Sequence, residues 1–120
     1  MNYKLVLFLS YILAIAGTMA LPLHRRGYSG EGTFYTVGLG SCGQTNSDSQ
    51  KVAALSSSIM SGGDNCGRSL TVTSGGKSVT VKAVDTCPSC GTGDVDLSPS
   101  AFKQLASLDK GRISISWSWS

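Results

Sequence analysis

Hydrophobic and polar residues alternate along several short stretches of this chain, a period of two that is typical of half-buried β-strands. Residues 77–84 (KSVTVKAV) show this alternation. Residues 112–119 (RISISWSW) alternate isoleucine or tryptophan with serine, so we expect both tryptophans to pack in the core. Residues 68–73 (RSLTVT) precede the first stretch across a Ser-Gly-Gly hairpin signal. Residues 31–37 (EGTFYTV) are aromatic and β-branched, and they predict the first strand.

Other segments predict short helices and a small barrel. Residues 51–55 (KVAAL) fit either a strand or a helix, and we interpret them as a strand followed by a helical turn at 56–60. A Ser-Pro pair, typical of a helix N-cap and first turn, predicts a helix over 99–107. Asp85 is expected to end the strand before it, because the proline and glycines that follow cannot continue a sheet. Short strands and many glycines favour an all-β closed barrel, because closure removes exposed strand edges.

Residues 1–20 have the features of a secretory signal peptide: an early lysine, an apolar run and small residues before a cleavage site. Residues 21–30 are interpreted as a short pro-segment, released at the Arg-Arg pair, or as a disordered basic tail, and both interpretations stay open. The domain is then expected over residues 31–120 of a secreted, extracellular protein.

The net positive charge of the chain comes from this N-terminal part. The whole sequence has ten basic and seven acidic residues, but three of the basic ones, Lys4, Arg25 and Arg26, precede the expected domain. From Gly27 onward the basic and acidic residues therefore balance. We expect neither nucleic acid nor an anionic membrane as a partner.

Four cysteines in a secreted chain of this size predict two disulfides, and the sequence alone leaves three pairings open. The Cys87-x-x-Cys90 spacing also occurs in redox and zinc sites. However, the chain has no second pair of this kind, and its single histidine, His24, precedes the expected domain. We therefore expect no metal and no other cofactor.

Four motifs follow one another in the order found in double-psi β-barrel proteins. They are Gly40-Ser-Cys-Gly43, Cys66-Gly67, Val84-Asp85-x-Cys-Pro-x-Cys90 and Asp96-Leu-Ser-Pro-x-Ala-Phe102. The chain from about residue 31 to 119 thereby resembles the domain shared by expansins, barwin-like proteins and rare lipoprotein A, and it is most similar to small secreted fungal loosenin-like proteins of a single domain. The resemblance implies a six-stranded double-psi β-barrel with an open groove for polysaccharide, and disulfides Cys42–Cys66 and Cys87–Cys90.

The same resemblance implies which residues form the groove. Asp96 matches an aspartate that lines the groove of expansins, and in related endoglucanases the matching aspartate is the general acid. The alternative is that Asp96 caps the following helix. Asp85 matches a second groove aspartate; the alternative is that it holds the next loop through bonds to the backbone. Tyr35 and Thr36 match groove residues of the first strand, where a tyrosine ring can stack on a sugar. Asp94 is interpreted as a solvated loop carboxylate.

The resemblance implies a monomeric, non-hydrolytic protein that binds cell-wall polysaccharide (glucan, chitin or peptidoglycan) and loosens its packing. Inverting hydrolysis needs two carboxyl groups about 6.5–9.5 Å apart. The first strand offers none beyond Glu31, and Asp85 would have to act as the second catalytic carboxylate beside Asp96.

Two other functions stay open. One is a secreted effector or an inhibitor of cysteine proteases that uses the stapled Cys87–Cys90 loop. The other is cleavage of peptidoglycan by a lytic transglycosylase route, which needs only one acid.

Overall fold

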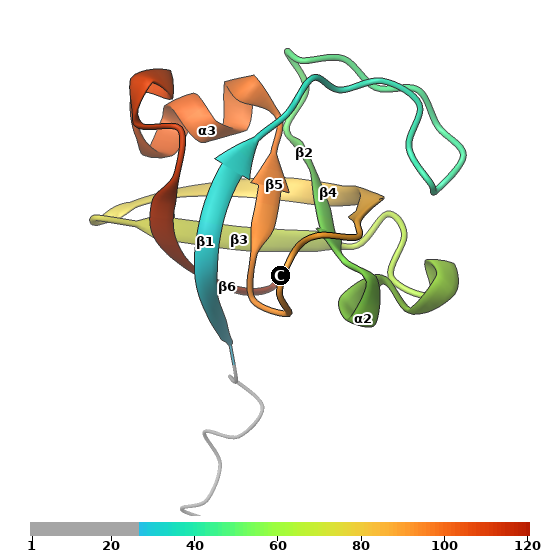
Figure 1. Ribbon diagram of the computed structural model, residues 1–120. Helices are drawn as coiled ribbons and strands as arrows, with labels where there is room; N and C mark the ends of the chain where they lie inside the picture. Colours follow the sequence, from blue (N-terminus) through green and yellow to red (C-terminus); the bar gives the residue numbers. More distant parts are fainter. Residues whose placement is uncertain (1–26) are drawn as a thin grey trace, which may run out of the picture.

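Residues 27–120 are described by a computed structural model, and the predicted signal peptide and the tail up to residue 26 lie outside the described residues. Six strands and several short helical segments follow one another along the chain (Figure 1). The strands are β1 (Tyr28–Phe34), β2 (Val52–Ser56), β3 (Ser69–Ser74), β4 (Lys77–Cys87), β5 (Val95–Leu97) and β6 (Ile113–Trp119). The helical segments are α2 (Ser57–Met60), η2 (Ser61–Gly63), α3 (Pro99–Leu105) and η3 (Leu108–Lys110).

The strands form one closed barrel in the order β1-β5-β2-β4-β3-β6. Pairing is parallel between β1 and β5 and between β2 and β4, and it is antiparallel in the other pairs. Because this order differs from the order along the chain, crossover connections bring distant segments side by side on the barrel wall. Figure 1 shows α3 at one end of the barrel and α2 at the other. The predicted six-stranded, all-β barrel is confirmed.

The first strand begins and ends three residues earlier than the predicted range 31–37. It begins at Tyr28 because this residue pairs with Trp117 of β6, and the two rings stack with centroids 4.3 Å apart. It ends at Phe34, where the chain leaves the sheet for the long connection to β2. Residues 28–30, which the sequence analysis assigned to the N-terminal tail, therefore belong to the barrel.

Strand β4 continues beyond its predicted end at Asp85. It reaches Cys87 because its parallel pairing with β2 continues through Asp85, Thr86 and Cys87. A register shift between Ala53 and Ala54 of β2 precedes this part of the pairing. The expectation that Asp85 ends the strand is therefore wrong, and its backbone belongs to the barrel wall. The predicted short strand and helical turn before it are present as β2 and α2.

Helix α3 begins as predicted but ends two residues early. Ser98 Oγ accepts a hydrogen bond from the Ala101 backbone N–H at 3.3 Å, and a proline occupies the first turn. The helix ends at Leu105 rather than Ser107, because Ala106 adopts an extended conformation with φ −166° and ψ 166°. The helix packs on β1, β4 and β5, so it closes the barrel end nearest to the Phe34 end of β1.

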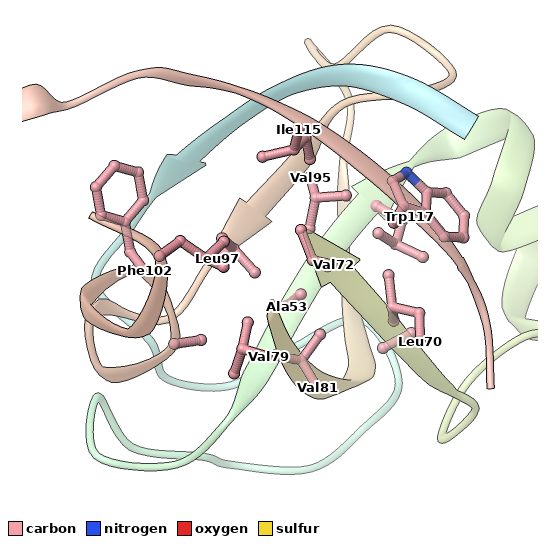
Figure 2. Close-up of a cluster of buried hydrophobic side chains, with 14 of the residues drawn as sticks. Ala53, Leu70, Val72, Val79, Val81, Val95, Leu97, Phe102, Ile115 and Trp117 are labelled. Carbon is pink, nitrogen blue, oxygen red and sulfur yellow. The ribbon is translucent and has the colours of Figure 1, made fainter. Parts of the chain in front are cut away.

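The core fills the barrel with aliphatic side chains from β2 to β6 and with residues of α3 (Figure 2). Figure 2 shows Phe102 of α3 at one end of this cluster and Trp117 at the other. Trp117 is 2% exposed, which confirms its predicted core position. Trp119 is partly buried against the same cluster, and the Arg68 guanidinium lies 4.1 Å from the centre of its ring. The stripe of β6 predicted from alternation is therefore the buried one.

Two disulfides fasten loops that extend from the barrel. Cys42–Cys66 joins the β1–β2 connection to the segment before β3, and Cys87–Cys90 closes a short loop after β4. This is the pairing that the resemblance implies. Within residues 27–120 no helix is long and apolar enough to cross a lipid bilayer. In the same part of the chain, no group of three or more His, Cys, Asp or Glu side chains is placed to hold a metal ion.

Candidate functional site

Asp96 projects from the barrel wall because its two neighbours in β5 fill the core. Val95 and Leu97 are fully buried, so the side chain between them points outward. In the parallel pair of β1 and β5, Asp96 lies opposite Thr33, whose Oγ1 donates a hydrogen bond to Asp96 Oδ1 at 2.8 Å. Ser98, and not Asp96, accepts the capping hydrogen bond of the helix that follows. The arrangement leaves Asp96 facing an open cleft.

The carboxyl group of Asp96 is half-buried, and this burial raises its pKa above the ordinary value for aspartic acid. The hydrogen bond from Thr33 and the positive charge of Arg112 oppose that effect, while the nearby charge of Asp85 adds to it. Asp96 therefore retains a proton to higher pH than a solvated aspartate does. Such a group can donate a proton to an oxygen atom, or exchange hydrogen bonds with a hydroxyl group.

The cleft next to Asp96 has a volume of about 270 Å³ and is lined mostly by polar groups. Its lining residues are Glu31, Thr33, Phe34, Cys87, Ser89, Cys90, Asp94, Asp96 and Arg112. Arg112 Nη1 and Glu31 Oε1 form an ion pair at 2.6 Å across the β1–β6 pairing. The apolar part of the lining comes from Phe34 and from the Cys87–Cys90 disulfide. The cleft thus combines a few charged groups with a small apolar wall.

Tyr35 lies directly after β1, and its backbone N–H donates to the carbonyl of Leu97 at 3.0 Å. Its hydroxyl is buried and has no hydrogen-bond partner within residues 27–120. Burial and, to a lesser extent, the nearby charges of Asp85, Asp96 and Asp48 together raise the pKa of Tyr35 to about 12. Tyr35 therefore lies close enough to Asp85 and Asp96 for their charges to act on it. Its role in polysaccharide binding stays a prediction.

Asp85 holds the loop that precedes β2. Its Oδ1 accepts hydrogen bonds from the backbone N–H groups of Ser41 and Thr86, each at 2.8 Å. The structure thus contains the loop-holding contacts that were the alternative interpretation of Asp85, although its charge still acts on Tyr35 and Asp96. Thr36 is exposed and does not line the cleft, so the structure does not bring it to Asp96.

Asp94 lies in the loop before β5, as expected, but its carboxylate is also hydrogen-bonded to the backbone on both oxygens. Its Oδ1 accepts from the Glu31 backbone N–H and its Oδ2 from the Gly91 backbone N–H, both at 2.9 Å. These two bonds lower the pKa of Asp94. The carboxylate therefore ties the loop after Cys90 to strand β1, beside the cleft.

Thr33 was not among the site residues predicted from the sequence. Thr33 contacts Asp96 only through the parallel register of β1 and β5, two segments 63 residues apart in the chain. Alternation within the first strand is the one local signal, because Thr33 shares a face with Glu31 of the same cleft. Arg112 was missed for a similar reason, since its place follows from the pairing of β6 with β1.

The closed barrel, its two disulfides and the aspartate cleft define a known class of protein. Residues 28–117 match the family described as lytic transglycolase, whose members have a double-psi β-barrel, and the chain belongs to this family. Allergen Asp f 7 of Aspergillus fumigatus is 42% identical over 79 residues, which are 64% of this chain and 29% of that protein.

Two solved structures are similar to this chain in both fold and sequence. Streptomyces papain inhibitor has a TM-score of 0.71 and 32% identity over 78% of this chain and 94% of its own. A mutant of the Clavibacter michiganensis expansin in complex with cellohexaose has a TM-score of 0.74 and 30% identity over 79% of this chain. The chain spans half of that expansin and less than a third of the Aspergillus allergen.

Proposed function

We propose that this is a secreted, expansin-like protein that binds cell-wall polysaccharide at the Asp96 cleft and loosens it without hydrolysis. The observation that carries the proposal is the half-buried Asp96 carboxyl, hydrogen-bonded by Thr33 and facing an open cleft. A neutral sugar chain offers hydroxyl groups that can donate to this carboxylate in place of hydroxyls of a neighbouring chain. The expansin bound to cellohexaose supports this assignment.

Binding without hydrolysis is favoured by the residues of β1 that face the cleft. The position opposite Asp96 is Thr33, which has no carboxylate and donates its hydroxyl proton to Asp96. The carboxylate of β1, Glu31, is held by Arg112 in an ion pair. A catalytic base must be free to activate a water on the far side of the sugar, and Glu31 is engaged elsewhere.

Binding to cellohexaose, measured by titration calorimetry on the purified protein, tests the proposal. Asp96→Asn and Thr33→Val each disturb one hydrogen-bonded group of the cleft, and we expect affinity to fall roughly 10-fold or more, as for a bond to a charged group. Asp64→Asn is the matched control, because it removes the same charge from an exposed loop.

Sugar release from cellulose, chitin and peptidoglycan, assayed alongside, separates binding from cleavage. Binding without release, weakened in Asp96→Asn, is the expected result. Release that disappears in Asp96→Asn would make the protein a one-acid enzyme of the kind that the family description names. The absence of binding to all three polymers would overturn the proposal.

Inhibition of a papain-like cysteine protease is the second candidate function. It is favoured by the similarity to Streptomyces papain inhibitor, which this chain covers over 94% of its length. This function needs an exposed, rigid contact with another protein rather than the Asp96 cleft, so the two functions can be tested separately.

A further inference from the structure

Leu39 is the one large hydrophobic residue within residues 27–120 that is exposed, with 74% of its surface accessible. It lies in the connection between β1 and β2, which extends away from the barrel in Figure 1. A single exposed leucine is common on protein surfaces. The backbone around Leu39 makes this one different.

The loop that carries Leu39 is fixed at several points. The Cys42–Cys66 disulfide ties it to the segment before β3. Ser41 is held from two sides, because its N–H donates to Asp85 and its Oγ lies 2.8 Å from Thr86 Oγ1. Contacts of this kind hold the loop in one conformation before any partner arrives, which lowers the entropy cost of binding.

Leu39 forms an antiparallel bridge with Thr45, and the flanking hydrogen bonds show which way its backbone faces. Gly40 N–H donates to the Gln44 carbonyl, and Asn46 N–H donates to the Gly38 carbonyl, both at 3.0 Å. Leu39 and Thr45 are therefore a non-hydrogen-bonded pair, whose own N–H and C=O groups point away from each other. In the described chain the N–H and C=O of Leu39 make no hydrogen bond.

The two residues that flank Leu39 leave its free N–H and C=O groups uncovered. Gly38 and Gly40 have no side chains, and a Cβ on Gly38 would meet open space. Gly40 must be glycine, because a Cβ there would lie 2.3 Å from the carbonyl oxygen of Val84. The segment thus presents an exposed apolar side chain between unpaired backbone groups, on a short extended segment held by an isolated β-bridge.

Such an edge matches one kind of partner. A cleft that binds an extended peptide pairs with its backbone as an added strand and reads a side chain in a pocket. The substrate cleft of an endopeptidase is of this kind. A polysaccharide can hydrogen-bond to the backbone but has no apolar pocket for the leucine.

We infer that the Leu39 loop, residues 37–46, docks into the substrate cleft of a papain-like cysteine protease, with the Leu39 side chain in an apolar pocket. This inference rests on the second candidate function and names the residues that would perform it. From the sequence, a protease contact was predicted at the Cys87–Cys90 loop instead. Pro88 and Ser89 of that loop are exposed, but the loop presents no exposed large hydrophobic side chain like Leu39.

The test is the inhibition constant for papain, measured with the purified wild-type protein and three variants. Leu39→Ala removes three side-chain carbons, the Cγ and the two methyl groups, and is expected to weaken inhibition roughly 50-fold. Leu39→Met keeps a side chain of similar size and should stay within a few-fold of the wild type. Lys77→Ala changes an exposed residue of the β3–β4 hairpin, outside residues 37–46, and is the control that should leave inhibition unchanged.

The outcomes separate this inference from the function on which it rests. Inhibition by the wild type that Leu39→Ala does not weaken would overturn the inference and leave the inhibitor function standing. No inhibition by the wild type would overturn both. Rapid cleavage of the chain within residues 37–46, with inhibition lost, would also overturn the inference, because the loop would then be a substrate.

Discussion

The Cys42–Cys66 disulfide should be the larger of the two covalent contributions to stability. It joins residues 24 positions apart, and the chain-entropy relation for a loop of this length gives roughly 3.5 kcal/mol of unfolding free energy. In a domain of this size each kcal/mol corresponds to roughly 4–8 °C in Tm. Replacing both cysteines by alanine should therefore lower Tm by roughly 14–28 °C.

The fold itself should survive this double substitution. Cys42 and Cys66 lie in loops outside the six strands, so every strand pair of the barrel keeps its hydrogen bonds. Asp85 and Asp48 continue to hold the β1–β2 connection through the backbone N–H groups of Ser41 and Val37. We expect an unchanged far-ultraviolet circular dichroism spectrum at low temperature.

Urea and thermal unfolding, followed by circular dichroism, measure the effect. The matched control replaces Cys87 and Cys90 by alanine. Those residues are only 3 positions apart, and the same relation gives roughly 1.6 kcal/mol. If the two double variants lose equal stability, or if the Cys42 and Cys66 variant loses less than about 1 kcal/mol, loop length is not the source of the stabilisation.

Two further predictions concern titratable groups. In a pH titration of tyrosine absorbance, Tyr35 should ionise near pH 12, a step that Tyr35→Phe abolishes. Because the unfolded value is about 10, its contribution to stability is complete below pH 10 and lost as pH rises toward 12; ionisation at the unfolded value would contradict its burial. Asp94→Asn weakens two backbone contacts and should lower the unfolding free energy by about 1 kcal/mol at neutral pH. The Asp94 pKa is lowered in the folded state, so its contribution is present above the unfolded pKa and is lost as pH falls through the folded value. An equal urea midpoint for Asp94→Asn and the wild type would contradict the predicted loss of unfolding free energy.

Local patterns in the sequence predicted the elements whose signals lie within a few residues. The β3–β4 hairpin and the buried stripe of β6 follow from alternation and a Gly-Gly turn. The outward direction of Asp96 follows in the same way from its two apolar neighbours. Each of these features depends on one segment alone, and the period of two is enough to specify it.

Features that depend on pairing between distant segments could not be predicted in this way. The start of β1 depends on Tyr28 stacking against Trp117, near the other end of the chain. Thr33 reaches Asp96 only because β5 enters the barrel parallel to β1. Asp94 accepts a hydrogen bond from the Glu31 backbone N–H because the same parallel pairing brings these two segments side by side. The motifs pointed to the aspartates, but the residues that hydrogen-bond to them are set by the register between distant strands.

Asp85 shows why the two candidate functions must be tested at other positions. Through Ser41 it holds the loop that presents Leu39, and through its charge it acts on Tyr35 and on Asp96. A substitution of Asp85 would disturb the loop and the cleft together, so a loss of either activity would not show which one the side chain serves. The side chain of Asp96 lines the cleft, whereas that of Leu39 is 74% exposed on the separate β1–β2 connection. Sensitivity to one of these two residues and not to the other therefore distinguishes a polysaccharide-binding protein from a protease inhibitor.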